Sequence, residues 1–276
     1  MRNWKLLPQN SDVARYVDCY WFLERKQGNS SPDHPKLNPD PAGHLILTAA
    51  EQGYQYDQDT VSAKGKGSHW IFPHCKTLLM DHSQPFLVLG IKFHIGALYS
   101  LKINPTQPIL DQVINVDFST LLKSKTFEEP DLLTKAVHDP ELCCDIMDKL
   151  LMPWLLDSHQ DKHSRLVYST LSLLSDTPIS KMGVALHCSQ RTIERSFLRV
   201  TGLTLKQCQS MNRLEAMLVY IHKLEGRNID WIDIAYRFGF SDQPHLIRYL
   251  KSNIGATPGG YAKQRDLAID VYGDFE

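Results

Sequence analysis

Two segments in the last third of this chain each open on a serine and then carry polar and basic side chains at helical spacing. The serines, Ser189 and Ser241, lie 52 positions apart. Arginine, glutamine and glutamate are suited to hydrogen bonds with the edges of guanine, adenine and cytosine, and isoleucine can contact a thymine methyl group. The candidate nucleic-acid contacts are Ser189, Gln190, Arg191, Thr192, Glu194 and Arg195 in the first segment, and Ser241, Gln243, Ile247, Arg248 and Lys251 in the second.

The same residue types can also bind the phosphate backbone, which positions a protein on a duplex without reading a base. Arg195 and Arg248 stand one step before inward-facing positions, so each is as suited to binding a phosphate or bracing the domain as it is to reading a base. Lys206 and Lys251 are expected to contact phosphates or to lie in solvent. The sequence therefore leaves base reading and phosphate binding open for these side chains.

Each segment follows a short apolar stretch and a turn, which is the order of a helix-turn-helix unit. Gly239 is expected to make the second turn with a positive φ, and the small Ala235 leaves room for a partner helix. Gly183 and His187 occupy the corresponding positions of the first unit. The two serines are predicted N-caps of the recognition helices. An apolar stripe between the units predicts a connecting helix over residues 205–224.

The charges of the chain are divided unevenly. Residues 165–265 hold fourteen Lys/Arg and seven Asp/Glu, a net charge of +7, whereas the other residues hold sixteen and twenty-four, a net charge of −8. The near-neutral total of −1 therefore hides a basic module joined to an acidic one. A basic module with outward arginines favours a phosphate-rich partner over an all-helical protein-binding domain.

The stretch from about Ser164 to Arg265 resembles the DNA-binding domain of the AraC/XylS transcription regulators. The marks of this resemblance are Ser189, Arg195, Phe197, Gly202, Arg213, Leu214, Ala216, Asp233, Ile234, Ala235, Gly239, Phe240, Ser241, Arg248, Lys251, Gly255, Thr257, Pro258 and Tyr261. It implies two recognition helices in successive major-groove segments of one DNA face, roughly 34 Å apart. His187, Ile247 and Leu250 depart from the family pattern, which leaves the preferred DNA sequence open.

The first half of the chain has a β composition. Aromatic and β-branched runs predict strands at residues 16–22, 45–48, 69–72 and 86–93, and turns or loops are expected at 28–41, 51–59 and 64–68. Such short strands favour a small barrel or sandwich. Residues 39–46 and 90–98 resemble the cupin-like N-terminal domain of one branch of these regulators. From 131 to 175 the chain is predicted to be helical, with a stripe through Leu142, Ile146, Lys149 and Leu150, and Pro153 is expected to kink or end that helix.

Other chemistry has weaker support in the sequence. His69, His74, Cys75, His82 and His94 cluster, but they lack the i, i+2 ligand spacing of a cupin metal site. We therefore expect histidines at a polar rim or pocket wall, with no metal and no cofactor. The six cysteines form no Cys-x-x-Cys pair and are predicted to be buried thiols, although a switch at Cys143–Cys144 stays open. No nucleophile elbow, catalytic triad or phosphate loop is found, so we expect no enzyme.

These observations predict a multi-domain β plus all-α protein. The expected parts are a cupin-like sensor domain at 1–128, a helical linker or dimerisation segment at 129–162, an AraC-type DNA-binding domain at 163–265 and an acidic tail at 266–276. The predicted function is that of a cytoplasmic, ligand-responsive transcription regulator that binds promoter or operator DNA. Further candidate partners are a small-molecule effector, RNA polymerase and a second copy of the chain. No membrane partner is expected. The alternatives are a cupin-type metal enzyme fused to a DNA-binding domain, and a regulator whose N-terminal domain only dimerises.

Overall fold

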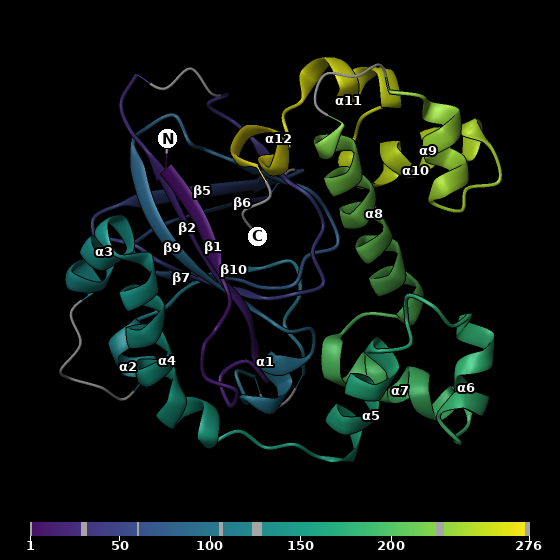
Figure 1. The fold of residues 1–276 in the computed structure, drawn as a ribbon, viewed down its shortest axis with the longest axis horizontal. Helices are drawn as coiled ribbons and strands as arrows, with labels where there is room; N and C mark the ends of the chain where they lie inside the picture. The colour runs from purple at the N-terminus through teal and green to yellow at the C-terminus, as the bar shows by residue number, and fades with distance from the viewer. Residues whose placement is uncertain are drawn as a thin grey trace.

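A computed structural model describes residues 2–28, 32–59, 61–104, 107–122, 129–224 and 229–273 of the chain. Its N-terminal part contains two antiparallel sheets, and its C-terminal part is helical (Figure 1). The predicted fold class, a β part followed by an all-α part, is therefore confirmed. The N-terminal strands are arranged as two separate sheets.

The larger sheet has six strands. In spatial order they are β1 (Arg2–Leu6), β2 (Val17–Arg25), β9 (Phe86–Phe93), β4 (His44–Leu47), β7 (His69–Ile71) and β10 (Val113–Asn115). The four-stranded sheet has the order β3 (Lys36–Leu37), β8 (Leu78–Met80), β5 (Gly53–Gln58) and β6 (Val61–Lys66). The four predicted strand regions are found as β2, β4, β7 and β9.

Two of the predicted loops are strands instead. Residues 51–59 and 64–68 were expected to be turns or loops, but they contain β5 and the second half of β6, and these two strands pair with each other from Gly53–Lys66 to Gln58–Val61. Both strands are mostly polar, because much of this hairpin is exposed. Only Tyr56 of β5 is buried, so the hairpin shows little of the apolar pattern from which strands are predicted.

The alternation of side chains along β2 explains why the larger sheet is covered on both faces. Trp21 and Leu23 point toward the smaller sheet, where they share a core with Tyr56, Leu78 and Met80. Gly90 on β9 pairs with Trp21, and a Cβ atom at Gly90 would lie 1.9 Å from the indole ring. The sheet therefore needs glycine at this position to hold the tryptophan.

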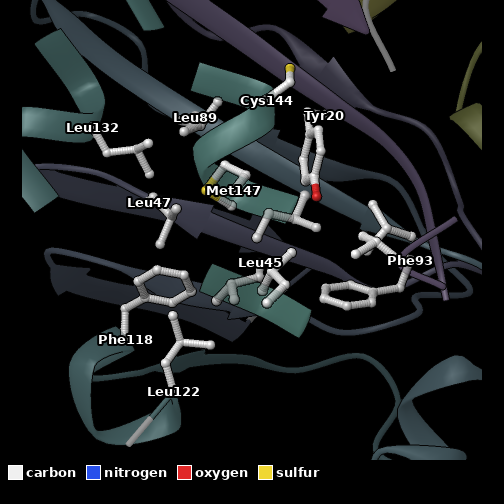
Figure 2. Packing of buried hydrophobic residues seen from close by; sticks show 14 of the residues in the cluster. Tyr20, Leu45, Leu47, Leu89, Phe93, Phe118, Leu122, Leu132, Cys144 and Met147 are labelled. Atoms are coloured by element: carbon white, nitrogen blue, oxygen red, sulfur yellow. The ribbon is translucent and has the colours of Figure 1, made fainter. Parts of the chain in front are cut away.

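Helices cover the opposite face of the larger sheet. They are α1 (Ala97–Ser100), α2 (Phe118–Leu122), α3 (Glu129–His138) and α4 (Pro140–Leu156). Figure 2 shows Cys144 and Met147 of α4 in one apolar cluster with the sheet residues Tyr20, Leu45 and Leu89. The helices of the segment predicted as a linker are thus part of the core of the N-terminal region.

The buried face of α4 differs from the predicted stripe. It consists of Cys143, Cys144, Met147, Asp148, Leu151 and Leu155, whereas Leu142 is 43% exposed. Asp148 can be buried because it accepts hydrogen bonds from the Tyr20 hydroxyl at 2.7 Å and from the backbone N–H groups of Gln9 and Asn10. Pro153 lies inside α4, and the helix continues to Leu156.

The remaining helices form the C-terminal part. They are α5 (Lys162–Leu171), the 3-10 helix η1 (Ile179–Lys181), α6 (Met182–Ala185), α7 (Gln190–Thr201), α8 (Leu205–Lys223), α9 (Trp231–Arg237), α10 (Gln243–Ile254), α11 (Pro258–Gln264) and α12 (Ala268–Tyr272). In Figure 1, α8 runs between the group α5–α7 and the group α9–α11, and α12 lies beside the sheets. Within the described ranges, no helix has both the length and the apolar character to cross a bilayer.

Candidate nucleic-acid interface

The first helix-turn-helix unit is α6, a tight turn and α7. His187 makes the turn with φ 50°, the left-handed conformation that Gly239 adopts in the second unit with φ 71°. Gly183 is needed in α6 because a Cβ atom there would lie 2.9 Å from the carbonyl oxygen of Cys188. The predicted cap is confirmed, since the Ser189 hydroxyl accepts a hydrogen bond from the Thr192 N–H at 3.1 Å.

Helix α7 turns one face inward and the other to solvent. Ile193 and Phe197 are completely buried, whereas Arg191, Thr192, Glu194 and Arg195 are exposed together with the cap Ser189. Gln190 is half-buried, and its amide donates to Oε1 of Glu194 at 3.1 Å. Five of the six residues predicted to contact nucleic acid in this segment are thus exposed, and the sixth, Gln190, is hydrogen-bonded to Glu194 on the same helix.

The second unit is α9, the turn at Gly239 and α10. The predicted cap is wrong by one residue, because Asp242 and not Ser241 caps α10 by accepting from the His245 N–H at 2.7 Å. Aspartate is as good a cap as serine, and here the helix begins one residue later, at Gln243. The Ser241 hydroxyl is hydrogen-bonded to the His245 ring instead, at 3.3 Å.

The outward face of α10 contains most of the residues predicted for it. Gln243, Arg248 and Lys251 are exposed, as is Ser241 in the turn, and Ile247 is half-buried. Leu246 and Leu250 are completely buried in the core of the unit. Leucine at 250 fills the interior position where the family pattern has phenylalanine.

Helix α8 joins the two units into one body. Its first half, with Leu205, Cys208 and Met211, lies in the core of the first unit. Its second half contributes Leu214, Met217, Leu218 and Ile221 to the core of the second unit. At 1.5 Å per residue its 19 residues span about 28 Å. The connecting helix predicted from the apolar stripe is confirmed, and it links the cores of the two units.

Arg213 is a structural residue that the sequence marked only through the family resemblance. Its guanidinium carbon lies 4.5 Å from the ring centre of Phe240 and 4.8 Å from that of Tyr249. Phe240 follows the turn of the second unit and Tyr249 lies on α10, so the arginine on α8 bridges both parts of that unit. An arginine at the edge of an apolar stripe, with aromatic residues further along the chain, is a signal too weak to identify this role.

The N-terminal region contacts both recognition helices at their C-terminal ends. Nε of Arg199 on α7 donates to the Tyr99 hydroxyl at 3.2 Å, and this hydroxyl donates to Asp161 at 2.8 Å. Oγ1 of Thr77 donates to the carbonyl oxygen of Asn253 on α10 at 2.6 Å. These contacts leave the N-terminal turns of both helices open.

The histidine cluster is engaged in hydrogen bonds within the protein. Nδ1 of His69 donates to the Gly67 carbonyl and Nε2 accepts from the Tyr56 hydroxyl, each at 2.9 Å. His74 is buried between the carbonyl groups of Phe72 and Asn38. In the parts of the chain that the structure describes, no group of three or more His, Cys, Asp or Glu side chains is arranged to hold a metal ion.

The cysteines are free in the structure. Cys19, Cys143, Cys144 and Cys208 are buried as predicted, and Cys75 and Cys188 are half-buried. Burial raises the pKa of both Cys143 and Cys144 to about 12, so at neutral pH these thiols carry their protons.

Two family models match the chain. Residues 182–264 match a helix-turn-helix domain, and residues 6–115 match a domain of unknown function, DUF6597. No curated protein matches the chain.

The chain is also similar to several solved structures. One is ToxT from Vibrio cholerae, at 12% identity over 87% of this chain and 97% of that chain, with a TM-score of 0.43. A second is ToxT from the same organism with an unsaturated fatty acid bound, at 12% identity, 91% and 100% coverage and a TM-score of 0.42. A third is the AraC-like transcriptional activator CuxR, at 10% identity, 78% and 86% coverage and a TM-score of 0.25.

The family match at 182–264 covers both capped turns, both recognition helices and the helix that joins them. This match and the geometry of the two units agree that residues 182–264 form a helix-turn-helix domain.

Proposed function

We propose that the chain is a transcription regulator of the AraC type, which binds one face of duplex DNA by placing α7 and α10 in consecutive major-groove segments. The observation that carries the proposal is the pair of N-terminal helix halves, each with an exposed face, that are joined by the single helix α8. Major-groove segments on one face recur roughly every 34 Å. Two recognition helices held by a connecting helix of about 28 Å suit that repeat.

Within this proposal the outward side chains have different roles. Arg191 and Arg195 on α7 and Gln243 and Arg248 on α10 are placed to reach base edges, because all four are exposed in the first two turns of their helices. Lys251 lies one turn further along α10, so we assign it to a phosphate. The hydrogen bond between Gln190 and Glu194 has to open before either of them can read a base.

We further propose that residues 163–265 are the DNA-binding domain and that the region before them senses an effector. A cavity of about 910 Å³ lies between the two regions. Its walls include Ile95 of the N-terminal region, Val167 of α5 and Val200 of α7, together with Arg15 and Arg165. No Asp or Glu is among the described residues that line it. An organic anion with an apolar body suits this lining, and it would lie against the end of a recognition helix.

The DNA proposal is tested by selecting duplexes from a random 40-base-pair library with the full chain and measuring affinity by fluorescence anisotropy. We expect two recognised segments separated by about one helical turn, and an affinity that falls steeply with salt. A chain that shows no salt-dependent affinity for any duplex would contradict the proposed function.

The effector proposal is tested separately by thermal shift with a panel of aliphatic and aromatic carboxylates. A ligand that binds only the folded chain raises the melting temperature by mass action. The matched control is Arg165→Ala, which removes one cation from the cavity wall and should reduce the shift. A carboxylate that shifts both chains equally would place its site elsewhere.

A further inference from the structure

The segment that follows the second helix-turn-helix unit enters the N-terminal region. Leu267 is 1% exposed and lies in the core of the second unit with Leu246 and Tyr261. Its neighbour Ala268 is also buried, together with Tyr272, but these two residues lie in the core between the two sheets. Adjacent residues of one short segment are thus built into the interiors of two different parts of the molecule (Figure 1).

Polar contacts fix the segment to the sheets. The Lys36 N–H of β3 donates to the Asp266 carbonyl at 2.8 Å, and the Lys36 ammonium lies 2.6 Å from the Asp266 carboxylate. The Asn3 amide of β1 donates to the carbonyl oxygen of Tyr272. The Tyr272 hydroxyl is hydrogen-bonded to Nδ1 of His82. Three separate places in the N-terminal region, namely β1, β3 and the loop after β8, therefore hold residues 266–272.

The same segment is anchored to the second unit. Oδ1 of Asp270 accepts hydrogen bonds from the Arg265 guanidinium at 2.9 Å and from the Tyr261 hydroxyl at 3.1 Å. Tyr261 lies on α11 and is 1% exposed in the core of that unit. Ile269 packs against the same core, whereas Val271 packs against the core between the sheets. Some residues of α12 thus face the second unit and others face the sheets.

These contacts restrain the second recognition helix and leave its reading face uncovered. The hydrogen bond from Thr77 holds the last turn of α10, and Gln243, in the first turn, is exposed. Arg248 is also exposed. The N-terminal region therefore acts on the orientation of α10 and does not block the surface that would meet DNA.

We propose that residues 266–273 are an intramolecular latch that holds the second helix-turn-helix unit in the orientation with which α7 and α10 bind one duplex together. With the latch open, the second unit has to be ordered again when DNA binds, which costs affinity. The role in DNA binding rests on the function proposed above. The latch itself rests on the contacts of Lys36, Asp266, Ala268 and Tyr272 alone.

A charge-reversal cycle tests the latch without removing any buried side chain. Lys36→Glu and Asp266→Lys each place like charges together at a pair whose side chains are 28% and 24% exposed, and the double variant restores an opposite pair. We expect each single variant to bind a selected two-segment duplex about three- to tenfold more weakly, and the double variant to recover most of the loss. The hydrogen-exchange rates of the α11 and α12 amides should rise in both single variants. In the double variant they should return to the rates of the unaltered chain.

Lys149→Glu is the matched control for charge. It makes the same change in net charge as Lys36→Glu and breaks an ion pair of the same length, 2.6 Å to Asp145, on α4. It should leave the exchange of α11–α12 and the affinity for the duplex unchanged. Tyr272→Phe provides a second probe, because it keeps the buried ring and removes the hydroxyl that is hydrogen-bonded to His82 and to Arg25.

The proposal is overturned if the single reversals leave the exchange of α11–α12 unchanged. It is equally overturned if exchange rises but the affinity stays the same, or if the affinity increases, since an increase would mean that the closed segment holds the second unit away from DNA. If the unaltered chain binds no duplex, the proposed function and the DNA part of this proposal both fail. In that case the hydrogen-exchange measurement still decides whether residues 266–273 are held against the N-terminal sheets.

Discussion

Lys92 in the core of the N-terminal region lies 3.4 Å from Glu215 on α8, the helix that joins the two DNA-binding units. The same ammonium lies 3.0 Å from the carboxylate of Asp40, which also lies 3.1 Å from Nε2 of His44. Burial disfavours the charged form of Asp40, but Lys92 and His44 outweigh this effect and hold the pKa of its carboxyl well below the usual range. A buried ion network thus ends on the helix that sets the spacing of the recognition helices.

This network predicts unequal effects of removing its members. Lys92→Met leaves Asp40 buried without its main counter-charge and should lower the free energy of unfolding by about 3–5 kcal/mol. Glu215→Gln removes the negative charge of a side chain that is 42% exposed, and it should lower the free energy of unfolding by less than about 1 kcal/mol. Urea unfolding of the two variants compares them directly. Equal losses would show that the interdomain contact and the buried pair contribute alike.

The exposed arginine at the start of α7 predicts a change in sequence preference. Arg191→Ala should reduce discrimination at one base pair by about 1–3 kcal/mol and leave preferences at the other positions intact. Lys251→Ala is the comparison, because loss of a phosphate contact weakens all sequences alike and lowers the salt slope by about 1. Competition anisotropy on single-base variants of a selected duplex measures both. An unchanged binding pattern would remove Arg191 from the residues that read bases.

The turn of the second unit predicts a conformational cost that can be isolated. Gly239 has φ 71° and has no atom within 4 Å of where a Cβ would stand, so Gly239→Ala tests backbone strain alone. We expect a loss of about 1 kcal/mol in the free energy of unfolding. Gly259→Ala on α11 is the matched control, since its Cβ also meets open space and its φ is not positive. That change should be neutral or stabilising by up to about 1 kcal/mol.

Two histidines, the buried His69 and the half-buried His82, predict that stability falls in mild acid. Burial lowers the pKa of His69 to about 4 and, together with the charge of Arg25, that of His82 to about 3. The unfolded chain protonates these rings near pH 6.5, whereas the folded chain keeps them neutral. The unfolded state therefore binds more protons below pH 6.5, so stability decreases as pH falls from 6.5 toward 4, by about 1.4 kcal/mol per pH unit for each ring.

Urea unfolding at pH 7, 6 and 5 measures this dependence. His69→Gln removes one titrating ring and should flatten the slope. If the free energy of unfolding of the His69→Gln chain depends on pH as steeply as that of the unaltered chain, groups other than His69 cause the loss of stability in acid.

The C-terminal units could be predicted because their signals are local. Gly239 and Ser189 mark a turn and a cap within a few residues of the helices that they bound, and the apolar spacing of α8 is complete within one segment. The one misplaced cap, Ser241 for Asp242, is an ambiguity between adjacent residues that are both good caps. The exposure of the predicted contact residues followed from the same helical spacing.

Features that depend on distant partners could not be predicted in this way. An aspartate such as Asp148 is expected on the outward face of a helix, but here its carboxylate accepts a hydrogen bond from the hydroxyl of Tyr20 on β2. The buried face of α4 is therefore shifted by one position from the predicted stripe. The hairpin β5–β6 is polar and reads as loops, although it completes the smaller sheet. Residues 266–276 read as an acidic tail, but Ala268 and Tyr272 find their partners on strands more than 180 residues earlier in the chain.

The position of α12 also bears on how the protein is made. Translation supplies β2 long before Tyr272, and at about 5–20 residues per second the strands would wait roughly 10–50 seconds for the side chains that complete the interior between the sheets. During this interval Trp21 and Phe86 lack one of their packing neighbours, so the nascent N-terminal region exposes an apolar gap on the ribosome. Synthesis of α12 supplies the missing neighbours, so completion of the interior between the sheets depends on synthesis of the helical C-terminal part.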